Sequence, residues 1–477
     1  MRAREMGYAA VPGIAAGLLI GCGGGGGGYG MAMMQPPLPP PAATVSFSAP
    51  SGATSINLGQ AVTLTWTSSN ASSCALSSSS TIGGAFTATQ PAAGTVGVAP
   101  TGTGNVTYML TCMGTNGNGT ATSAVITVNP AILSMLSTST ITTIGSTLDP
   151  VEKGGNPYGL AIAPATAGLI TKGDLVVCNI NDGATNTQGQ GTTIVGLHPT
   201  AGAMPYRIAQ SSLLLGCNAL TVLPDDSISA AAYSSNLNPL VTPTGTVNNP
   251  FSAYAFEHPW GEAYVTAKGS NPAALYISNV DGSLDRLALN ADMSTTFTQI
   301  ATGFCGSGQP GSIFAPSGLT YDPSSDTLYI VDTSSYSVVA FANVSSIGSG
   351  GVVVAGQCGS GTTQPTPQPT FSGPSASSVR VIANRGGFIA PLSAALLADG
   401  DLIVANADIN IGATQMPNLV FEISPWLPGG FVGPPVQLDT SGTAGALFGI
   451  ATAVDAQGHQ VVYFNDDNTN AVMMITQ

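Results

Sequence analysis

Hydrophobic and polar side chains alternate with a period of two in several segments between residues 43 and 130. Val62, Leu64 and Trp66 are separated by threonines, and residues 106–112 alternate in the same way. This period is typical of β-strands with one buried face, and the Ser-, Gly-, Asn- and Thr-rich stretches between these segments favour turns. The pattern predicts a small all-β domain over residues 43–130.

A different unit recurs between residues 131 and 477. It consists of a turn with Pro and Gly, an apolar strand, a short hairpin, a second strand ending in Asn or Asp, and a third strand. Copies begin near residues 156, 218, 259, 315, 391 and 448. Such an array predicts a β-propeller in which each copy forms one blade, and a β-sandwich or a solenoid is the competing arrangement.

The two ends of this array predict how the ring closes. The last copy offers three strands, whereas an unassigned strand, Ser139–Gly145, precedes the first copy. We expect the early strand to complete the last blade, because this pairing removes a free sheet edge.

Both regions resemble known families. V-T-L-T-W-T-S-S-N-A-S-S-C (Val62–Cys74) with Y-M-L-T-C (Tyr108–Cys112) resembles bacterial immunoglobulin-like (Ig-like) domains, although Trp66 precedes the first cysteine, whereas it follows it in antibody domains. The resemblance implies a spacer or an adhesion module, of which we favour the spacer, and we expect a Cys74–Cys112 disulfide. The pattern P-x-G-L-x-x-D-P at residues 316–323 resembles NHL-repeat propellers. The predicted fold class is therefore all-β: an Ig-like β-sandwich followed by a six-bladed β-propeller over residues 131–477.

The N-terminal residues have the pattern of an export signal. Arg2 and Arg4 precede an apolar run that is too short to cross a bilayer. Leu19-Ile20-Gly21-Cys22 resembles the lipobox of bacterial lipoproteins. The resemblance implies that residues 1–21 are a lipoprotein signal peptide and that acylated Cys22 anchors the chain in a lipid bilayer. An ordinary secretory signal with an incidental cysteine is the alternative.

The residues after the signal predict a tether and a location. Residues 22–42 contain six consecutive glycines and then a proline-rich run, which is typical of a flexible segment followed by a stiffer one. Gly23, rather than an aspartate, follows the cysteine, which resembles the outer-membrane sorting pattern. We therefore expect an exported lipoprotein at the outer membrane or cell surface.

Charge and cysteine content narrow the classes of function. The 477 residues include 9 basic and 23 acidic ones, a net charge of −14 that argues against a nucleic-acid partner. No Asp, Glu, Lys, Arg or His occurs between residues 6 and 148, so acid–base chemistry is expected after residue 148. Apart from Cys22 there are six cysteines, which suggests up to three disulfides in an oxidising compartment. The sequence leaves open how Cys178, Cys217, Cys305 and Cys358 pair.

Asn and Asp recur where the second strand of each repeat ends. Repeat register places these residues on one face of the disc, which we call the loop face. Their oxygens are candidate ligands for a hard cation such as calcium, the one cofactor considered, although none is assigned. The preferred interpretation is that they cap strand-ending turns by bonding to nearby backbone amides. The candidate metal residues are Asp182, Asp281, Asp332, Asp408 and Asp466, accompanied by Asn179, Asn279, Asn406, Asn465 and Asp467.

The densest group of reactive side chains lies at the start of the third copy. Glu257, His258 and Glu262 are the candidate catalytic residues, because carboxylates flanking an imidazole can act as acid and base. Trp260, between them, is the candidate binding residue. The preferred interpretation is that His258 and Trp260 pack between blades and that the glutamates are solvated.

Taken together, these patterns favour a membrane-anchored binding scaffold whose loop face meets a protein or a glycan. Trp260, Tyr336 and Trp426 are candidate aromatic anchors for such a contact. One alternative is a calcium-dependent lactonase-like hydrolase or a lyase that uses the candidate catalytic residues. The other is a purely architectural envelope protein without a ligand.

Overall fold

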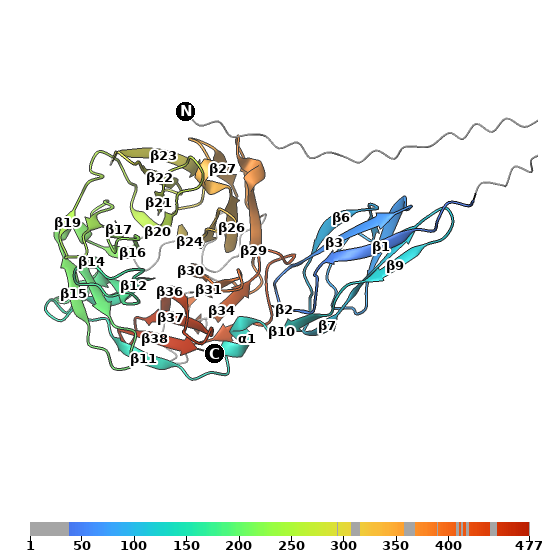
Figure 1. Ribbon diagram of the computed structural model, residues 1–477. Helices are drawn as coiled ribbons and strands as arrows, with labels where there is room; N and C mark the ends of the chain where they lie inside the picture. The colour runs from blue at the N-terminus through green and yellow to red at the C-terminus, as the bar shows by residue number, and fades with distance from the viewer. Residues whose placement is uncertain are drawn as a thin grey trace, which may run out of the picture. The chain divides into compact units, whose positions relative to one another are not determined.

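Strands dominate the computed structural model of the chain (Figure 1). The all-β prediction is confirmed, since the described residues contain one short α-helix, α1 (Ile132–Leu136), and three 3₁₀ turns. Residues 42–477 form one compact unit. The structure describes residues 38–292, 294–306, 315–356, 368–388, 390–406, 410–411, 414–415, 419–438 and 446–476.

Residues 44–129 form three sheets around one hydrophobic core. The period-two pattern has the predicted effect, because Leu64 and Trp66 are buried while Thr63 and Thr67 are exposed. The first sheet contains β1 (Thr44–Ala49), β3 (Val62–Ser69) and β6 (Gly94–Val98), and the second β2 (Thr54–Asn57), β10 (Ile126–Asn129) and β7 (Gly104–Val106). The third contains β5 (Thr89–Gln90), β4 (Ser73–Ser78), β8 (Tyr108–Met113) and β9 (Gly119–Thr122). Its β4 and β8 are joined by the predicted Cys74–Cys112 disulfide, which is confirmed.

After α1, the chain forms six blade sheets, one for each predicted repeat, of which five have four strands and one has six. Blade one contains β12 (Gly155–Ile162), β13 (Leu175–Asn181), β14 (Gln188–Leu197) and β15 (Tyr206–Gln210), and blade two β16 (Cys217–Val222), β17 (Ile228–Ala232), β18 (Leu240–Val241) and β19 (Val247–Asn248). Blade three contains β20 (Pro259–Val265), β21 (Ala274–Asn279), β22 (Leu284–Leu289) and β23 (Thr295–Thr302), and is extended by β27 (Val352–Ala355) and β28 (Thr370–Ser372).

The remaining blades follow the same order. Blade four contains β24 (Pro316–Asp322), β25 (Thr327–Asp332), β26 (Ser337–Ala342) and β29 (Val379–Asn384), and blade five β30 (Pro391–Leu396), β31 (Leu402–Asn406), β34 (Leu419–Ile423) and β35 (Val436–Gln437). Blade six contains β36 (Ala446–Val454), β37 (Gln460–Asp466), β38 (Ala471–Thr476) and β11 (Thr142–Ser146). The 3₁₀ turns η1 (Ser212–Leu214), η2 (Val344–Ser346) and η3 (Ala376–Ser378) and the hairpin of β32 (Asn410–Ile411) and β33 (Thr414–Gln415) lie between these strands.

The innermost strands of the six blades close a ring (Figure 1). Each contacts the next, in the order β12, β16, β20, β24, β30, β36 and back to β12. The predicted β-propeller and its six blades are therefore confirmed. The predicted closure is also confirmed, because β11 pairs antiparallel with β38 and completes blade six.

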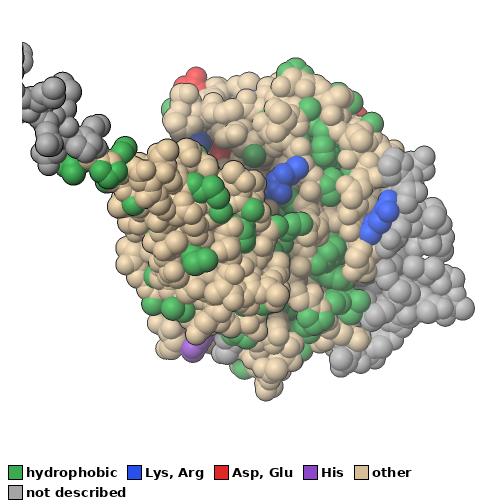
Figure 2. Space-filling view, turned by 90° about the vertical axis from the view of Figure 1, so that its right-hand side faces the viewer, with side chains coloured by type: hydrophobic (Ala, Val, Ile, Leu, Met, Phe, Trp, Pro, Cys, Tyr) green, Lys and Arg blue, Asp and Glu red, His purple; other side chains and the backbone are tan. Residues whose placement is uncertain are grey.

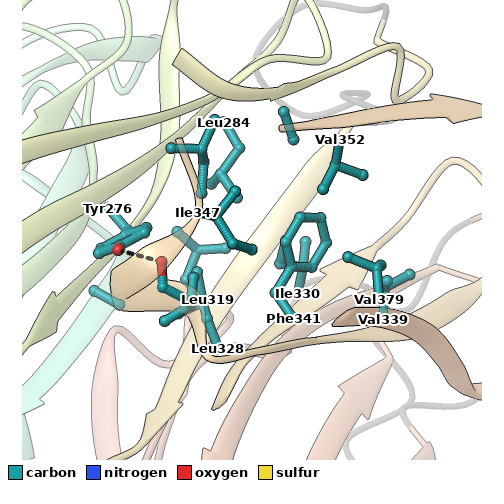
Figure 3. Close-up of a cluster of buried hydrophobic side chains, with 14 of the residues drawn as sticks. Tyr276, Leu284, Leu319, Leu328, Ile330, Val339, Phe341, Ile347, Val352 and Val379 are labelled. Carbon is teal, nitrogen blue, oxygen red and sulfur yellow. Dashed lines mark hydrogen bonds between the residues drawn. The ribbon is translucent and has the colours of Figure 1, made fainter. Parts of the chain in front are cut away.

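Neighbouring blades are held together by apolar side chains from both sheets. Between blades three and four, Tyr276, Leu328 and Phe341 are buried in one cluster (Figure 3). The hydroxyl of Tyr276 donates a hydrogen bond to the carbonyl oxygen of Val344 at 3.0 Å, so its polar end is satisfied inside the core. Strands packed between two neighbours need apolar side chains on both faces, which explains the uninterrupted hydrophobic runs of the second strands.

A second disulfide, Cys178–Cys217, joins β13 of blade one to β16 of blade two. Cys305 is also disulfide-bonded, whereas Cys22 and Cys358 lie outside the described residues. Disulfides persist in oxidising surroundings, which indicates an extracytoplasmic protein. The predicted signal peptide and most of the predicted tether also lie outside the described residues. In the described part of the chain, no helix is both long enough and apolar enough to span a membrane.

Charged side chains are sparse on the face drawn in Figure 2. Backbone and uncharged polar side chains cover most of it, with scattered hydrophobic side chains between them. This agrees with the charged fraction of 7% in the sequence.

Candidate functional site

A pocket lies where the six innermost strands meet. Each strand contributes three consecutive residues at equivalent positions. The cavity has a volume of about 120 Å³, enough for several water molecules or an ion. The lining residues are 158–160 of β12, 218–220 of β16, 260–262 of β20, 317–319 of β24, 392–394 of β30 and 448–450 of β36.

The middle residue of each triplet is small, and the reason is the close approach of neighbouring blades. A Cβ atom on Gly261 would overlap with the carbonyl oxygen of Ser317, and one on Gly318 would lie 2.7 Å from the carbonyl oxygen of Leu392. The six residues are Gly159, Ala219, Gly261, Gly318, Ser393 and Gly449. Sequence reasoning did not single them out, although a glycine at the same position in four repeats was the available signal.

Aromatic side chains gather where the innermost strands begin, at the loop face. The rings of Tyr158 and Phe448 are stacked with centroids 4.1 Å apart, and Trp260 meets Tyr158 edge-on at 6.1 Å. The indole N–H of Trp260 donates to the Ser317 hydroxyl at 3.2 Å. All three aromatic residues are among those that line the pocket.

The aromatic cluster corrects the expectation of exposed aromatic anchors. Trp260 is 7% exposed and lies in the pocket wall, and Tyr336 is 1% exposed and packs in the blade core. Neither side chain is available for a flat surface contact. Of the three predicted anchors, Trp426 is exposed, at 56%.

Glu262 supplies the carboxyl group of the pocket. Asn238 Nδ2 donates to its Oε1 at 3.1 Å, while its Oε2 is buried and has no hydrogen-bond partner among the described residues. Burial raises the pKa of Glu262 to about 7, against the opposing effect of hydrogen bonds from Ser229 and Asn238. The side chain therefore titrates near neutral pH, where a carboxyl group can donate or accept a proton.

The other two candidate catalytic residues lie outside this pocket. Glu257 and His258 are exposed at the loop face, and of the three candidates only Glu262 is among the described lining residues. The His258 ring stacks on Tyr233 with centroids 4.7 Å apart, and its Nδ1 lies 3.0 Å from the Tyr233 carbonyl oxygen. The predicted acid–imidazole–acid cluster is therefore not assembled. The expectation that both glutamates are solvated is also wrong for Glu262, which is 6% exposed.

Each candidate metal residue that the structure describes stabilises, by hydrogen bonds, the turn in which it lies. Asp182 accepts hydrogen bonds from the backbone N–H groups of Thr185 (2.8 Å) and Thr187 (2.7 Å), and Asp281 accepts one from that of Ser283 (2.9 Å). Asp332 accepts from Ser334 and Ser335, and Asp466 from Asn468 and Thr469. These contacts are the Asx-type turn bonds that were the preferred interpretation of the pattern. Asp408 lies outside the described residues.

The asparagines next to these turns are buried and bonded within the fold. Asn179 Nδ2 donates to the Thr147 carbonyl oxygen, Asn279 to the Asp285 carboxylate, Asn406 to the Gly387 carbonyl oxygen and Asn465 to the Tyr158 carbonyl oxygen. Among the described residues, the carboxylates close enough to share one metal ion are a different set, Asp399, Asp401 and Glu422. Sequence reasoning did not select this set.

A polar groove lies beside blade one, at the end of its sheet that is nearest the loop face. Its volume is about 300 Å³, near the lower end of the range for small-ligand sites. Burial alone would raise the pKa of Asp182, but the hydrogen bonds from Thr187 and Thr185 together outweigh this effect and lower the pKa. The lining residues are Glu152, Gly154, Asp182, Gly183, Ala184, Thr192 and Thr193.

Comparisons with known proteins show likeness of fold. No protein-family model and no curated protein matches the sequence. Among solved structures, virginiamycin B lyase from Staphylococcus aureus is 13% identical and aligns over 71% of this chain and 99% of its own, with a TM-score of 0.39. A gluconolactonase from Xanthomonas campestris is 12% identical over 69% of this chain and 88% of its own (TM-score 0.43). Regucalcin, a calcium-binding protein from Agrobacterium tumefaciens, is 13% identical over 70% and 93% (TM-score 0.34).

Proposed function

We propose that this protein is an exported, membrane-anchored lipoprotein whose propeller binds a glycan at the loop face. In this proposal Cys22 carries the lipid, residues 22–42 form a tether, and the Ig-like sheets of residues 43–130 act as a spacer. The disulfides support an extracytoplasmic location. A protein ligand is the alternative.

The polar groove beside blade one carries the proposal. Carboxylate oxygens and hydroxyl groups line it, and these are the groups that exchange hydrogen bonds with the hydroxyls of a sugar. Glu152 is 53% exposed, so its carboxylate is accessible from solvent. The groove volume fits one sugar unit better than an extended protein surface.

The groove is preorganised by the turn that forms its wall. The carboxylate of Asp182 accepts hydrogen bonds from Thr185 and Thr187, which fixes the loop after β13 before any ligand arrives. A site that is already ordered loses less conformational entropy on binding.

A binding assay tests the groove. The full-length protein, purified in a mild detergent, is screened on a glycan array, and the best glycan is titrated against the Thr192→Val and Glu152→Gln variants. We expect each variant to bind at least about tenfold more weakly, because Thr192→Val removes a hydroxyl that bonds to the ligand and Glu152→Gln replaces a charged acceptor with a neutral one. Gln457→Ala, in the exposed turn between β36 and β37 on the opposite face, is the control and keeps full affinity. No glycan binding, or equal binding by all variants, contradicts the proposal.

Cell fractionation tests the anchor separately. We expect the wild-type chain in the membrane fraction and the Cys22→Ser variant in the soluble fraction, because the variant has no thiol to acylate. Equal distribution of the two proteins would refute lipid anchoring without affecting the glycan proposal.

Glu262 supports a second candidate function, a hydrolase or lyase that acts in the central pocket. A buried carboxyl group that titrates near neutral pH is a common property of catalytic acids and bases. Turnover of lactones or esters that is lost in Glu262→Gln and retained in Glu257→Gln would favour this candidate. Equal turnover by both variants would exclude Glu262 as its acid or base.

A further inference from the structure

Three carboxylates come together in blade five, at the end opposite the loop face. Asp399 and Asp401 lie in the turn between β30 and β31, and Glu422 lies on the adjacent strand β34. One oxygen of each carboxylate lies within 4.8 Å of the others. We call this group the blade-five triad.

Two segments from earlier in the chain cover the triad. Asn57 Nδ2 donates to Asp399 Oδ2 at 3.2 Å, and Gly59 lies so close that a Cβ atom there would overlap with Asp401 Oδ2. The backbone N–H of Leu133, in α1, donates to Glu422 Oε2 at 2.6 Å. The triad is therefore enclosed by the N-terminal sheets, by α1 and by the propeller.

Asp401 is the second observation that points to a ligand. Its side chain is fully buried, at 0% exposure, and neither of its carboxylate oxygens has a hydrogen-bond partner among the described residues. A buried carboxylate without a partner costs several kcal/mol unless another group compensates it. Among the described residues, no group donates a hydrogen bond to either oxygen, so a group that donates to them or coordinates them is still to be accounted for.

The charge of the triad is also unbalanced. The ion pairs among the described residues involve Asp149, Glu152, Asp174 and Asp455, and none includes a triad carboxylate. The three carboxylates therefore lie close together, and no described Lys, Arg or His forms an ion pair with them.

We infer that the blade-five triad binds a hard divalent cation, Ca²⁺, which fastens the N-terminal sheets to the propeller. Carboxylate oxygens are the preferred ligands of hard cations. Ca²⁺ lies about 2.4 Å from its ligands, so oxygens up to about 4.8 Å apart fit in one coordination shell. Asp399 is only partly buried, which leaves access for water to complete the shell.

A calcium titration tests this site. The full-length chain, purified in a mild detergent and freed of metal on a chelating resin, is titrated with CaCl₂ while bound calcium and the melting temperature are measured. We expect about one Ca²⁺ per chain and a melting temperature higher by a few degrees, since the ion binds the folded state only. Chymotryptic cleavage within residues 130–141 should become severalfold slower, because the ion would hold both sides of this segment.

Two variants and a control locate the ion. Asp401→Asn and Asp399→Asn should each weaken calcium binding at least about tenfold and lose the temperature shift. Metal-free Asp401→Asn should melt above metal-free wild type, because it removes a buried acid that has no partner. Asp292→Asn changes an exposed aspartate in the turn between β22 and β23 and should respond like wild type.

Either of two results would overturn the inference. A wild-type chain that binds no calcium would show that the blade-five triad is not a calcium site. Calcium binding that is unchanged in both Asp399→Asn and Asp401→Asn would place the ion elsewhere. Both results are independent of glycan binding, which the groove variants report.

Discussion

Replacing Glu262 with glutamine should change how the stability of the protein depends on pH. The pKa of Glu262 is raised by burial from 4.5 to about 7. Between these values the unfolded chain has lost the proton, whereas the folded protein still holds it. The unfolded state therefore binds fewer protons, and the free energy of unfolding falls as pH rises through this window.

The size of the effect follows from the shift in pKa. Each unit corresponds to about 1.4 kcal/mol, so the wild type should lose about 3 kcal/mol of stability between pH 4.5 and 7 through this group. Glu262→Gln has no proton to lose, and its amide oxygen can still accept the hydrogen bond from Asn238. Relative to wild type, the variant should gain about 3 kcal/mol over the same window.

Urea unfolding at pH 4.5, 5.5, 6.5 and 7.5, followed by tryptophan fluorescence, measures this difference. Comparing each variant with wild type at the same pH cancels the titration of every other buried acid. Glu257→Gln changes an exposed carboxyl group in the same loop and should run parallel to wild type. If Glu262→Gln also runs parallel to wild type, the Glu262 carboxyl group is not held protonated by the pocket.

Three further changes test the packing of the blades. Replacing Cys178 and Cys217 by serine should lower the free energy of unfolding by about 4 kcal/mol, because the disulfide closes a loop with a sequence separation of 39. An unchanged urea midpoint would contradict this prediction. Gly261→Ala should lower the stability measured by thermal unfolding by about 1 to 3 kcal/mol. Gly348→Ala is the control and should have little effect, because a Cβ atom there meets nothing within 4 Å. Equal melting temperatures of the two variants would refute the close approach of the innermost strands. Tyr276→Phe should cost about 1 kcal/mol by removing one buried hydrogen bond, as measured by chemical denaturation, and no loss would mean that the hydroxyl contributes nothing.

The fold was largely predictable because its signals are local. Each blade repeats the same order of turns and apolar strands, so the number of repeats gives the number of blades. The strand before the first repeat predicted the closure, because a three-stranded last blade leaves an edge that needs a partner. The disulfide between β4 and β8 also agreed with the prediction.

The site was less predictable because it depends on how strands bend and meet. Glu257, His258 and Glu262 are neighbours in sequence, but the pairing of β20 with β21 shifts register between Pro259 and Gly261. Glu257 and His258 lie in the exposed loop before β20, whereas Glu262 lies within β20, one of the innermost strands. Periodicity alone does not reveal such a shift.

The blade-five triad shows a second limit of sequence reasoning. The sequence Asp399-Gly400-Asp401 is typical of a turn. Glu422 lies about twenty residues later, on β34, which pairs with β31. Their burial comes from Gly59 and α1, which lie several hundred residues earlier in the chain. Contacts of this kind have no local pattern.

The pairing of β11 with β38 has a consequence for the order of folding. The two strands are separated by more than three hundred residues. β11 is therefore synthesised well before β38 and cannot pair with it until synthesis is almost complete. Such distant contacts slow folding, since a long loop must close before they form. During this interval β11 and the inner blades expose strand edges that can pair with other chains. Export in an unfolded form, with folding only after the last strand arrives, would shorten the time during which those edges are exposed.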